Sequence, residues 1–287
     1  MRISYNMPAL TMHLLQNQAL NRQSTNLLNI SSGYKINSTK DKPSGMVASQ
    51  NMKLQIGGLQ SASRNVQDGI SMLQTAEGGL QEITSMIQRV RELAVQAGNG
   101  GTTEDDRQIM QNEIDQLLDG MNSMANGTEF NGLKLLSGDS SKTLKMQSGA
   151  NRGENIEIPQ INLTNTTGSE ISQLYDIGTN GSTGSHKLVS NADIGDVLHA
   201  ANDALDTVID IRSKYGALEN RFESSYDDLQ DISNRTIGAE SSLSDADIAE
   251  EIMNYTKEDI IVQASNAMIV QANKLPQDVL SILSNIK

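Results

Sequence analysis

A seven-residue repeat of apolar and small side chains constrains this chain more than any other feature of its sequence. One run covers residues 66–97, with Glu77 and Thr84 as its polar interruptions. A longer run covers residues 197–239. Steps of three and four residues that alternate over such lengths are typical of coiled-coil seams. We therefore predict long helices that pack along each other, the second spanning about 60 Å at 1.5 Å per residue.

A third helix is predicted directly after the glycine-rich turn at Gly98–Gly101. Thr102 or Thr103 can cap it, because Asp105 and Asp106 follow them by three residues as in a capping box. The turn would make this helix antiparallel to the one before it. Its expected buried positions are Met110, Ile114, Leu117, Met121 and Met124.

Two later helices also have candidate caps. Ser190 with Asp193 resembles a capping box for the long second seam, and Ser244 is a candidate N-cap for the last helix. The repeat is absent between about residues 133 and 188, where LKLL, TLKMQ and NIEI are separated by glycine-rich turns. These segments predict one or two β-hairpins that close the end of the rod. Residues 162–185, rich in Thr, Asn, Ser and Gly, are expected to form an exposed loop.

Composition argues against several classes of function. The chain has no Cys, and His13, His186 and His199 lack the spacing of a zinc site. A net charge of -13 argues against binding to nucleic acid or to an anionic membrane surface. No HExxH, GxSxG or P-loop motif occurs. We therefore expect no enzyme, no cofactor and no metal.

Neither a membrane span nor a cleaved export signal is predicted. No segment approaches the roughly 20 apolar residues that cross a bilayer. The opening MRISYNMPAL has one Arg but no long apolar run of the kind that a secretion signal needs. Residues alone leave two alternatives, a cytoplasmic protein or one that leaves the cell without a cleaved signal.

The two ends of the chain carry amphipathic helical patterns with few charges on the other faces. A lone chain cannot easily cover both apolar stripes, so they are expected to pair with each other or with neighbouring copies. Our hypothesis is that both ends are loose in the single chain and fold when copies stack, with ordinary packing within the chain as the alternative. The stripe residues singled out are Leu10, Leu14, Leu27 and Ile30 at one end and Ile252, Met268, Leu275, Val279, Leu280 and Leu283 at the other.

A second stripe flanks the first seam. Arg89 and Leu93 follow Met86 and precede Gln96 at steps of three and four residues, beside the predicted buried positions. Leu93 is expected to be partly exposed on an isolated rod. It either packs against another helix of the same bundle or forms part of a surface that contacts another subunit or a receptor.

Many motifs in series resemble one family, the bacterial flagellins. In the first half these are INSTKDKPSGMVAS, GLQSASRNVQDGISMLQTAEGGLQEI, QRVRELAVQAGNG and FNGLKLL. LKMQSGANRGENIEI resembles the small β region of flagellins, and GALENRFESSYDDL, SDADIAEE and ASNAMIVQANKLPQDVLSIL resemble their C-terminal half. The resemblance covers nearly the whole chain, and the short middle implies a form without the outer variable domains.

The resemblance implies a mainly α fold: an elongated antiparallel coiled-coil rod with a small β-hairpin region and paired N- and C-terminal helices. We expect core helices at 1–43 and 244–287, rod helices at 44–130 and 190–243, and the hairpin and loop cap at 131–189. Function would be polymerisation into the flagellar filament for swimming motility. The main alternatives are a hook–filament junction protein and a secreted monomeric helical adhesin or immune ligand.

Partners and location also follow from the resemblance. The chain would bind itself in a helical homopolymer and meet filament cap and hook-junction proteins, outside the cell, after export through the flagellar type III channel. Toll-like receptor 5 would contact Arg89, Leu93 and Glu113, the positions that match the receptor-binding residues of flagellins. An export chaperone would bind the C-terminal end at Leu280, Ile282, Leu283 and Ile286.

Overall fold

The chain, seen in a computed structural model, consists of two compact units. Residues 1–56 and 234–287 form unit 1, and residues 57–233 form unit 2. The structure describes residues 6–139, 142–166, 168–178 and 194–285, with the backbone alone at 275, 279, 280 and 282–285. The division between the units falls inside two long helices, α2 and α5, rather than at helix ends.

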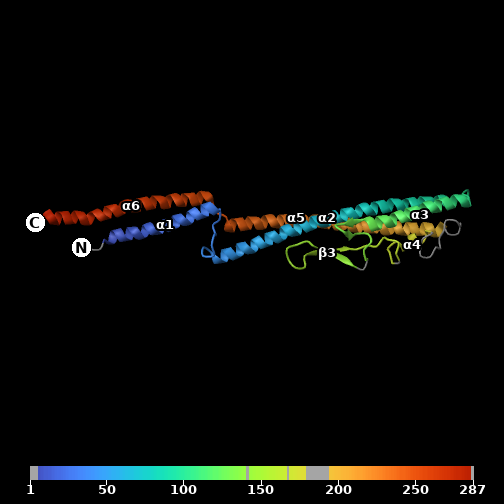
Figure 1. Ribbon diagram of the computed structural model, residues 1–287, viewed down its shortest axis with the longest axis horizontal. Coiled ribbons are helices and arrows are strands. Elements are labelled where there is room, and N and C mark those ends of the chain that lie inside the picture. The colour runs from blue at the N-terminus through green and yellow to red at the C-terminus, as the bar shows by residue number, and fades with distance from the viewer. Residues whose placement is uncertain (1–5, 140–141, 167, 179–193, 286–287) are drawn as a thin grey trace. The chain divides into compact units, whose positions relative to one another are not determined.

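Helices make up most of the described chain, as the repeat predicts (Figure 1). They are α1 (Met7–Ser32), α2 (Pro43–Ala97), α3 (Glu104–Gly127), the short α4 (Ser172–Tyr175), α5 (Ile194–Ser244) and α6 (Ile248–Asn285). Pro43 opens α2, where its missing N–H costs no hydrogen bond. The mainly α fold class and the paired terminal helices are confirmed.

Unit 2 is built on the two predicted seams. Most of their members are buried in one core that α2, α3 and α5 share, and Val66 and Leu80 are fully enclosed. The second seam ends earlier than predicted: Leu229 is buried, but Ile232 and Ala239 are exposed. The difference arises because unit 2 ends at Ser233, where the shared core stops.

Polar interruptions within the first seam are satisfied by hydrogen bonds. Glu77 accepts two of them from Arg212 of α5, at 2.9 and 2.7 Å, and Thr84 donates to the carbonyl oxygen of Leu80 at 2.7 Å. Neither residue therefore breaks the helix packing. Pairs between α2 and α5 run in opposite order along the two helices, which makes them antiparallel: Glu77–Arg212, Gln74–Glu219, Gln67–Tyr226 and Ser63–Gln230.

The helix hairpin predicted around the glycine-rich turn is confirmed. α2 ends at Ala97, and Thr103 caps α3. Asp106 donates its backbone N–H to the Thr103 hydroxyl, and its carboxylate accepts from the Thr103 backbone N–H, both at 3.2 Å. Hydrogen bonds from Thr103 to this carboxylate also lower the pKa of Asp106.

Two antiparallel hairpins follow, β1 (Glu129–Phe130) with β2 (Leu133–Lys134) and β3 (Thr143–Gln147) with β4 (Asn155–Pro159). They confirm the predicted hairpins. Asn131 and Gly132, with φ of 51° and 79°, give the first a two-residue turn whose twist matches its strands.

The hairpins do not close the end of the helix bundle, so that prediction was wrong. β3 and β4 lie along α2 and α5: Asn65 donates to the carbonyl oxygen of Gln147 at 3.4 Å, and Tyr215 to that of Pro159 at 3.2 Å. Alternate residues of β4 are buried, which fixes one face of the hairpin against the helices. Figure 1 shows β3 beside the helices. The end of the bundle is formed instead by the turn between α2 and α3.

The segment predicted as an exposed loop is largely buried where the structure describes it. Ile171, Leu174 and Ile177 join the core around α4, and Tyr175 donates to the carbonyl oxygen of Leu163 at 2.9 Å. Burial raises the pKa of Tyr175. The polar composition of this segment predicted that it would be exposed, but its few apolar residues anchor it in the core. Residues 179–185, like the proposed cap Ser190–Asp193, lie outside the described residues.

In unit 1, a short backbone pairing joins the segment that follows α1 to the segment between α5 and α6. Lys35 donates its N–H to the carbonyl oxygen of Ser244 at 2.7 Å, and Ala246 donates to that of Gly33 at 2.9 Å. Gly33 ends α1 with φ of 76°. Ser244 is not the predicted cap. It is the last residue of α5, and Asp247 caps α6 by accepting from Ala249 at 2.9 Å.

Candidate assembly and receptor-contact surfaces

Polar side chains hold α1 and α6 together. The described parts of both ends are helices that pair with each other, and the hypothesis that they become ordered only when copies stack stays a prediction. Small residues, Ala19, Ser265 and Ala272, are buried, and Cα atoms of the two helices come within 8 Å of each other. The antiparallel hydrogen-bonded pairs are Asn6–Asn273 (3.0 Å), Gln16–Asn266 (2.6 Å), Arg22–Glu258 (3.5 Å), Gln23–Asp259 (3.2 Å) and Asn29–Glu251 (3.1 Å).

Large apolar side chains of this pair lie on its outside. The predicted stripe residues are between 49% and 59% exposed: Leu10, Leu14, Leu27, Ile252 and Met268. Ile30 is half-buried. The side chains of Leu275, Val279, Leu280 and Leu283 lie outside the described part of the chain. The residues buried between these two helices are small or polar, and the large apolar residues are exposed. The hydrophobic free energy of burying those apolar side chains is therefore not gained in the single chain.

Charge is distributed as unevenly as hydrophobicity. Unit 1 carries 10 Lys and Arg against 9 Asp and Glu, a net charge of +1, whereas unit 2 carries 12 against 26, a net charge of -14, which together give the -13 of the chain. Arg22 is the one charged residue of α1, and residues 260–273 of α6 have none. Copies of unit 1 can therefore approach one another with little like-charge repulsion.

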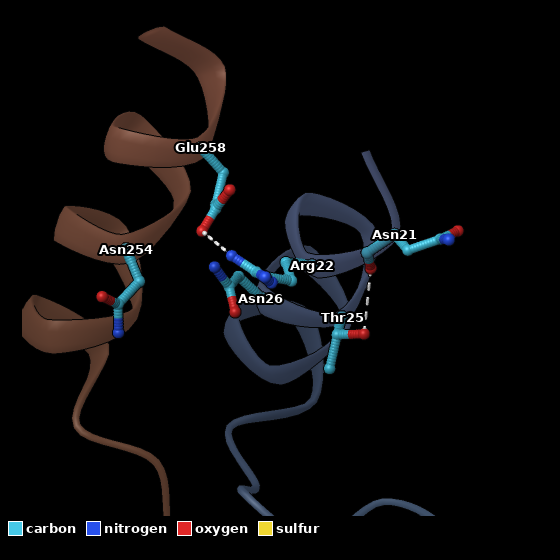
Figure 2. Close-up of a pocket in the computed structure, with 6 residues that line it drawn as sticks. All are labelled: Asn21, Arg22, Thr25, Asn26, Asn254 and Glu258. Carbon is cyan, nitrogen blue, oxygen red and sulfur yellow. Dashed lines mark hydrogen bonds and ion pairs between the residues drawn. The ribbon is translucent and has the colours of Figure 1, made fainter. Parts of the chain in front are cut away.

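A groove of about 390 Å³ lies on the α1–α6 pair, shown in Figure 2. Glu258 on its floor is 6% exposed, and its Oε2 has no hydrogen-bond partner. Arg22 reaches Oε1 at 3.5 Å but is itself mostly exposed. The lining residues are Asn21, Arg22, Thr25, Asn26, Asn254 and Glu258. Sequence reasoning missed this groove, although the isolated charge of Arg22 in a neutral helix was a visible signal.

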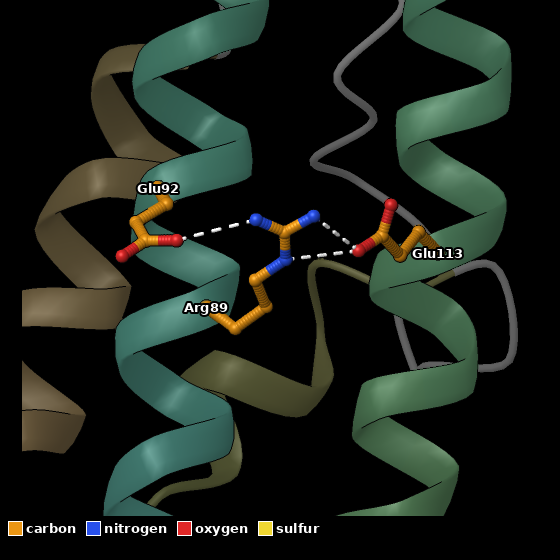
Figure 3. A network of polar contacts seen from close by, with 3 residues as sticks. All are labelled: Arg89, Glu92 and Glu113. Atoms are coloured by element: carbon orange, nitrogen blue, oxygen red, sulfur yellow. Dashed lines mark hydrogen bonds and ion pairs between the residues drawn. The ribbon is translucent and has the colours of Figure 1, made fainter.

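Arg89 on α2 lies opposite Glu113 on α3, as Figure 3 shows. Its Nε and Nη2 donate to Oε1 of Glu113 at 2.9 and 2.7 Å, and Nη1 donates to Glu92 at 3.2 Å. These two carboxylates raise the pKa of Arg89, Glu113 more than Glu92. All three side chains are at least 44% exposed, so the cluster can be reached from solvent.

Leu93 is not at the surface, which corrects the expectation of partial exposure. Only 2% of it is exposed, and it belongs to the core of unit 2 together with Val90, Ala94 and Ala97. Packing against another helix of the same bundle is therefore the correct alternative. A helix with two neighbours buries a wider face than a two-stranded seam, so the flanking position also lies inside.

Neither a cluster of metal-binding side chains nor a membrane-crossing helix is found among the described residues. No group of three or more His, Asp or Glu among them could hold a metal ion. None of the helices in the described ranges is long and apolar enough to cross a membrane. His199 pairs with Asp203 at 2.8 Å on the surface of α5, His13 is exposed, and His186 lies outside the described residues.

Two family models match the chain. The bacterial flagellin N-terminal helical region covers residues 3–141, and the C-terminal helical region covers residues 198–283. A flagellin of Halalkalibacterium halodurans is 37% identical, with 99% of this chain and 100% of that protein covered. The chain belongs to the bacterial flagellin family. This confirms the resemblance seen in its motifs, and because flagellins are structural filament proteins, it also confirms that the chain is not an enzyme.

Other relatives agree with this assignment. A flagellin of Bacillus subtilis is 39% identical over 99% of this flagellin and 100% of its own length. The flagellar filament 30.7 kDa core protein of Treponema maltophilum is 34% identical over 90% of this chain and 91% of its own. A putative flagellar hook-associated protein of Vibrio parahaemolyticus shares the fold, with a TM-score of 0.57 at 16% identity over 71% of this chain and all of its own.

Replacing Leu93 and Arg89 separately will distinguish a core residue from a surface residue. Leu93→Ala removes buried methyl groups and is expected to lower the free energy of unfolding by about 2–5 kcal/mol. Arg89→Ala removes an exposed ion pair and is expected to cost under about 1 kcal/mol. Urea titration followed by circular dichroism measures both, and equal losses would contradict the assignment.

Proposed function

We propose that this flagellin is the repeating subunit of a flagellar filament that serves swimming motility. Its family supports the proposal, as does a relative whose name is that of a flagellar filament core protein. The observation that carries it is the α1–α6 pair, whose buried side chains are small or polar and whose leucines lie on its outside. Such a surface gains free energy when other copies cover it.

Burial of these side chains provides the driving force. Covering a large aliphatic side chain contributes roughly 1.5–3 kcal/mol. Among the described residues of α1 and α6, thirteen large apolar side chains are between 41% and 66% exposed, and covering them can offset the loss of translational and rotational freedom on joining a polymer. Because unit 1 has almost no net charge, repulsion between copies does not cancel the free energy of this burial. The acidic unit 2 keeps the single subunit soluble.

The route to the filament is part of the same proposal. The subunit would leave the cell through the flagellar type III channel and assemble outside it, between the hook-junction proteins and the filament cap. An export chaperone would hold Leu280, Ile282, Leu283 and Ile286, whose side chains lie outside the described residues. The apolar pattern of these four residues supports a helix-binding partner.

Two substitutions on the outer face of α1 test the filament proposal. Leu10→Gln with Leu14→Gln changes side chains that are already exposed, so the single subunit should unfold as the wild type does. Growth from filament seeds, measured by sedimentation, should fall at least about tenfold because burial of two leucines is lost. The wild type should restore swimming to a strain that lacks its flagellin, and the variant should not.

Ile209→Gln is the matched control, because Ile209 is also about half exposed but lies on α5 in unit 2. It should grow from seeds as the wild type does. A wild type that stays monomeric under every seeding condition would contradict the proposal and favour the monomeric adhesin. Filaments of the leucine double variant that grow at the wild-type rate would show that the outer face of α1 is not an assembly surface.

A second function, recognition of the single subunit by Toll-like receptor 5, is supported by the Arg89 cluster. Arg89 and Glu113 are held side by side and exposed, in the positions that the family resemblance assigns to the receptor contact. Leu93 is buried, so we propose that it acts by holding α2 in place beneath them. Receptor and filament contacts are compatible, since the receptor would meet subunits that are not assembled.

Charge reversal at Arg89 tests this second function. Arg89→Asp places a carboxylate against Glu113 and Glu92 and should reduce the potency in a receptor reporter assay at least about tenfold, equivalent to ~1.4 kcal/mol. Arg91→Asp, two residues along the same helix and also exposed, is the control and should change potency far less. A silent wild type, or equal potency of the Arg89 variant, would contradict receptor recognition.

A further inference from the structure

Helix α6 contains a proline inside its length, at Pro276. A proline has no backbone N–H, so the carbonyl oxygen four residues before it, that of Ala272, lacks its usual helical donor. Ala272 is buried, with 9% of its surface exposed. Buried backbone oxygens are nearly always paired in folded proteins, so this one needs a donor from outside its own helix.

The other end of the chain supplies that donor. Nδ2 of Asn6 donates to the carbonyl oxygen of Ala272 at 3.0 Å and to Oδ1 of Asn273 at 3.0 Å. Oδ1 of Asn6 accepts from the backbone N–H of Ala9 at 3.3 Å and so caps α1. An amide has two N–H groups and one carbonyl oxygen, which together suffice for all three bonds. One side chain therefore serves both helices.

The position of this contact along α6 gives it a further consequence. Asn6 is the first residue that the structure describes, and it lies beside Asn273. α6 continues over residues 274–285 beyond that level. Pro276 thus lies just past the level of Asn6, at the start of the last turns of α6. Those turns are joined to the rest of α6 through a stretch that lacks one of its own helical hydrogen bonds.

We propose that Asn6 is a latch that keeps α6 continuous across Pro276, and that its release lets residues 276–285 move apart from the α1–α6 pair as a separate segment. While the latch is closed, α1 is capped and the carbonyl oxygen of Ala272 has a donor. When Asn6 leaves, both are lost together. The latch forms within one chain, so it does not depend on the proposed filament.

The latch couples the two ends of the chain to each other. A helix bends or opens most easily where a proline has removed a hydrogen bond. Loss of the Asn6 contacts should therefore loosen residues 276–285 more than residues 248–266, which other hydrogen bonds such as Gln23–Asp259 hold to α1. Any partner that draws Asn6 away from α6 would loosen the last turns of α6 at the same time.

Asn6→Asp tests the latch in the full-length chain. Its carboxylate keeps the cap of α1, because Asp caps helices as well as Asn does, but it has no N–H for the carbonyl oxygen of Ala272. Backbone hydrogen exchange, followed by mass spectrometry in the single subunit and in filaments grown from seeds, should become at least about tenfold faster over residues 277–285 and change far less over residues 248–266. Asn6→Ser, which keeps a cap without adding a charge, should have the same effect.

Pro276→Ala provides the decisive comparison, because alanine donates its own N–H to the carbonyl oxygen of Ala272 within the helix. In that background, Asn6→Asp should raise exchange over residues 277–285 less than about twofold, since the two changes act on the same oxygen. A general weakening of the α1–α6 pair would instead give equal increases in both backgrounds.

Gln16→Glu is the matched control. Gln16 also donates from α1 to an asparagine of α6, Asn266, at 2.6 Å, but at a level of α6 without a proline. The same change from amide to carboxylate should leave exchange over residues 277–285 nearly as in the wild type.

Three results would rule out the latch. They are equal exchange of Asn6→Asp and wild type over residues 277–285, an effect of Asn6→Asp that Pro276→Ala does not reduce, and wild-type exchange there as fast as in an unstructured peptide both before and after assembly. A wild type that does not polymerise would overturn the filament proposal alone, because the measurement on the single subunit then decides about the latch.

Discussion

The pairing of α1 with α6 buries small and polar side chains where most helix pairs bury leucines, and the assembly surface depends on this inversion. Ala19 and Ser265 are buried between the helices and Gln16 donates to the exposed Asn266, while Leu14 and Met268 face water. Hydrogen bonds between neutral side chains give little net stability when water can replace them. The pair therefore holds together on small buried residues and polar contacts, and it keeps its apolar surface available for other copies.

The two units divide the physical tasks of the molecule. Unit 2 has a conventional core, in which helix seams bury their apolar faces and a hairpin covers part of α2 and α5. It buries its own hydrophobic core and carries the net negative charge of the chain. Unit 1 has few large buried side chains and almost no net charge. One unit thus suits a stable, soluble subunit and the other suits assembly.

The periodicity of the sequence correctly predicted the features that are determined by residues close together in the chain. Both seams, the Thr103 cap and the hairpins follow from spacing that one helix or hairpin can enforce by itself. Errors came where placement depends on distant partners. A seam of two helices places Leu93 on its flank, whereas in this chain a third helix buries it. Residues 162–178 were assigned to a loop because polar composition hid the anchors Ile171 and Leu174.

The outer face of the α1–α6 pair is expected to become buried by other copies. Thiol labelling tests it directly, because the chain has no cysteine and Leu14→Cys would introduce the single reactive group. Labelling of this variant with a maleimide should be fast in the single subunit and at least about tenfold slower after assembly from seeds, whereas Ile209→Cys on unit 2 should change far less. Equal labelling rates of Leu14→Cys before and after assembly would contradict the account.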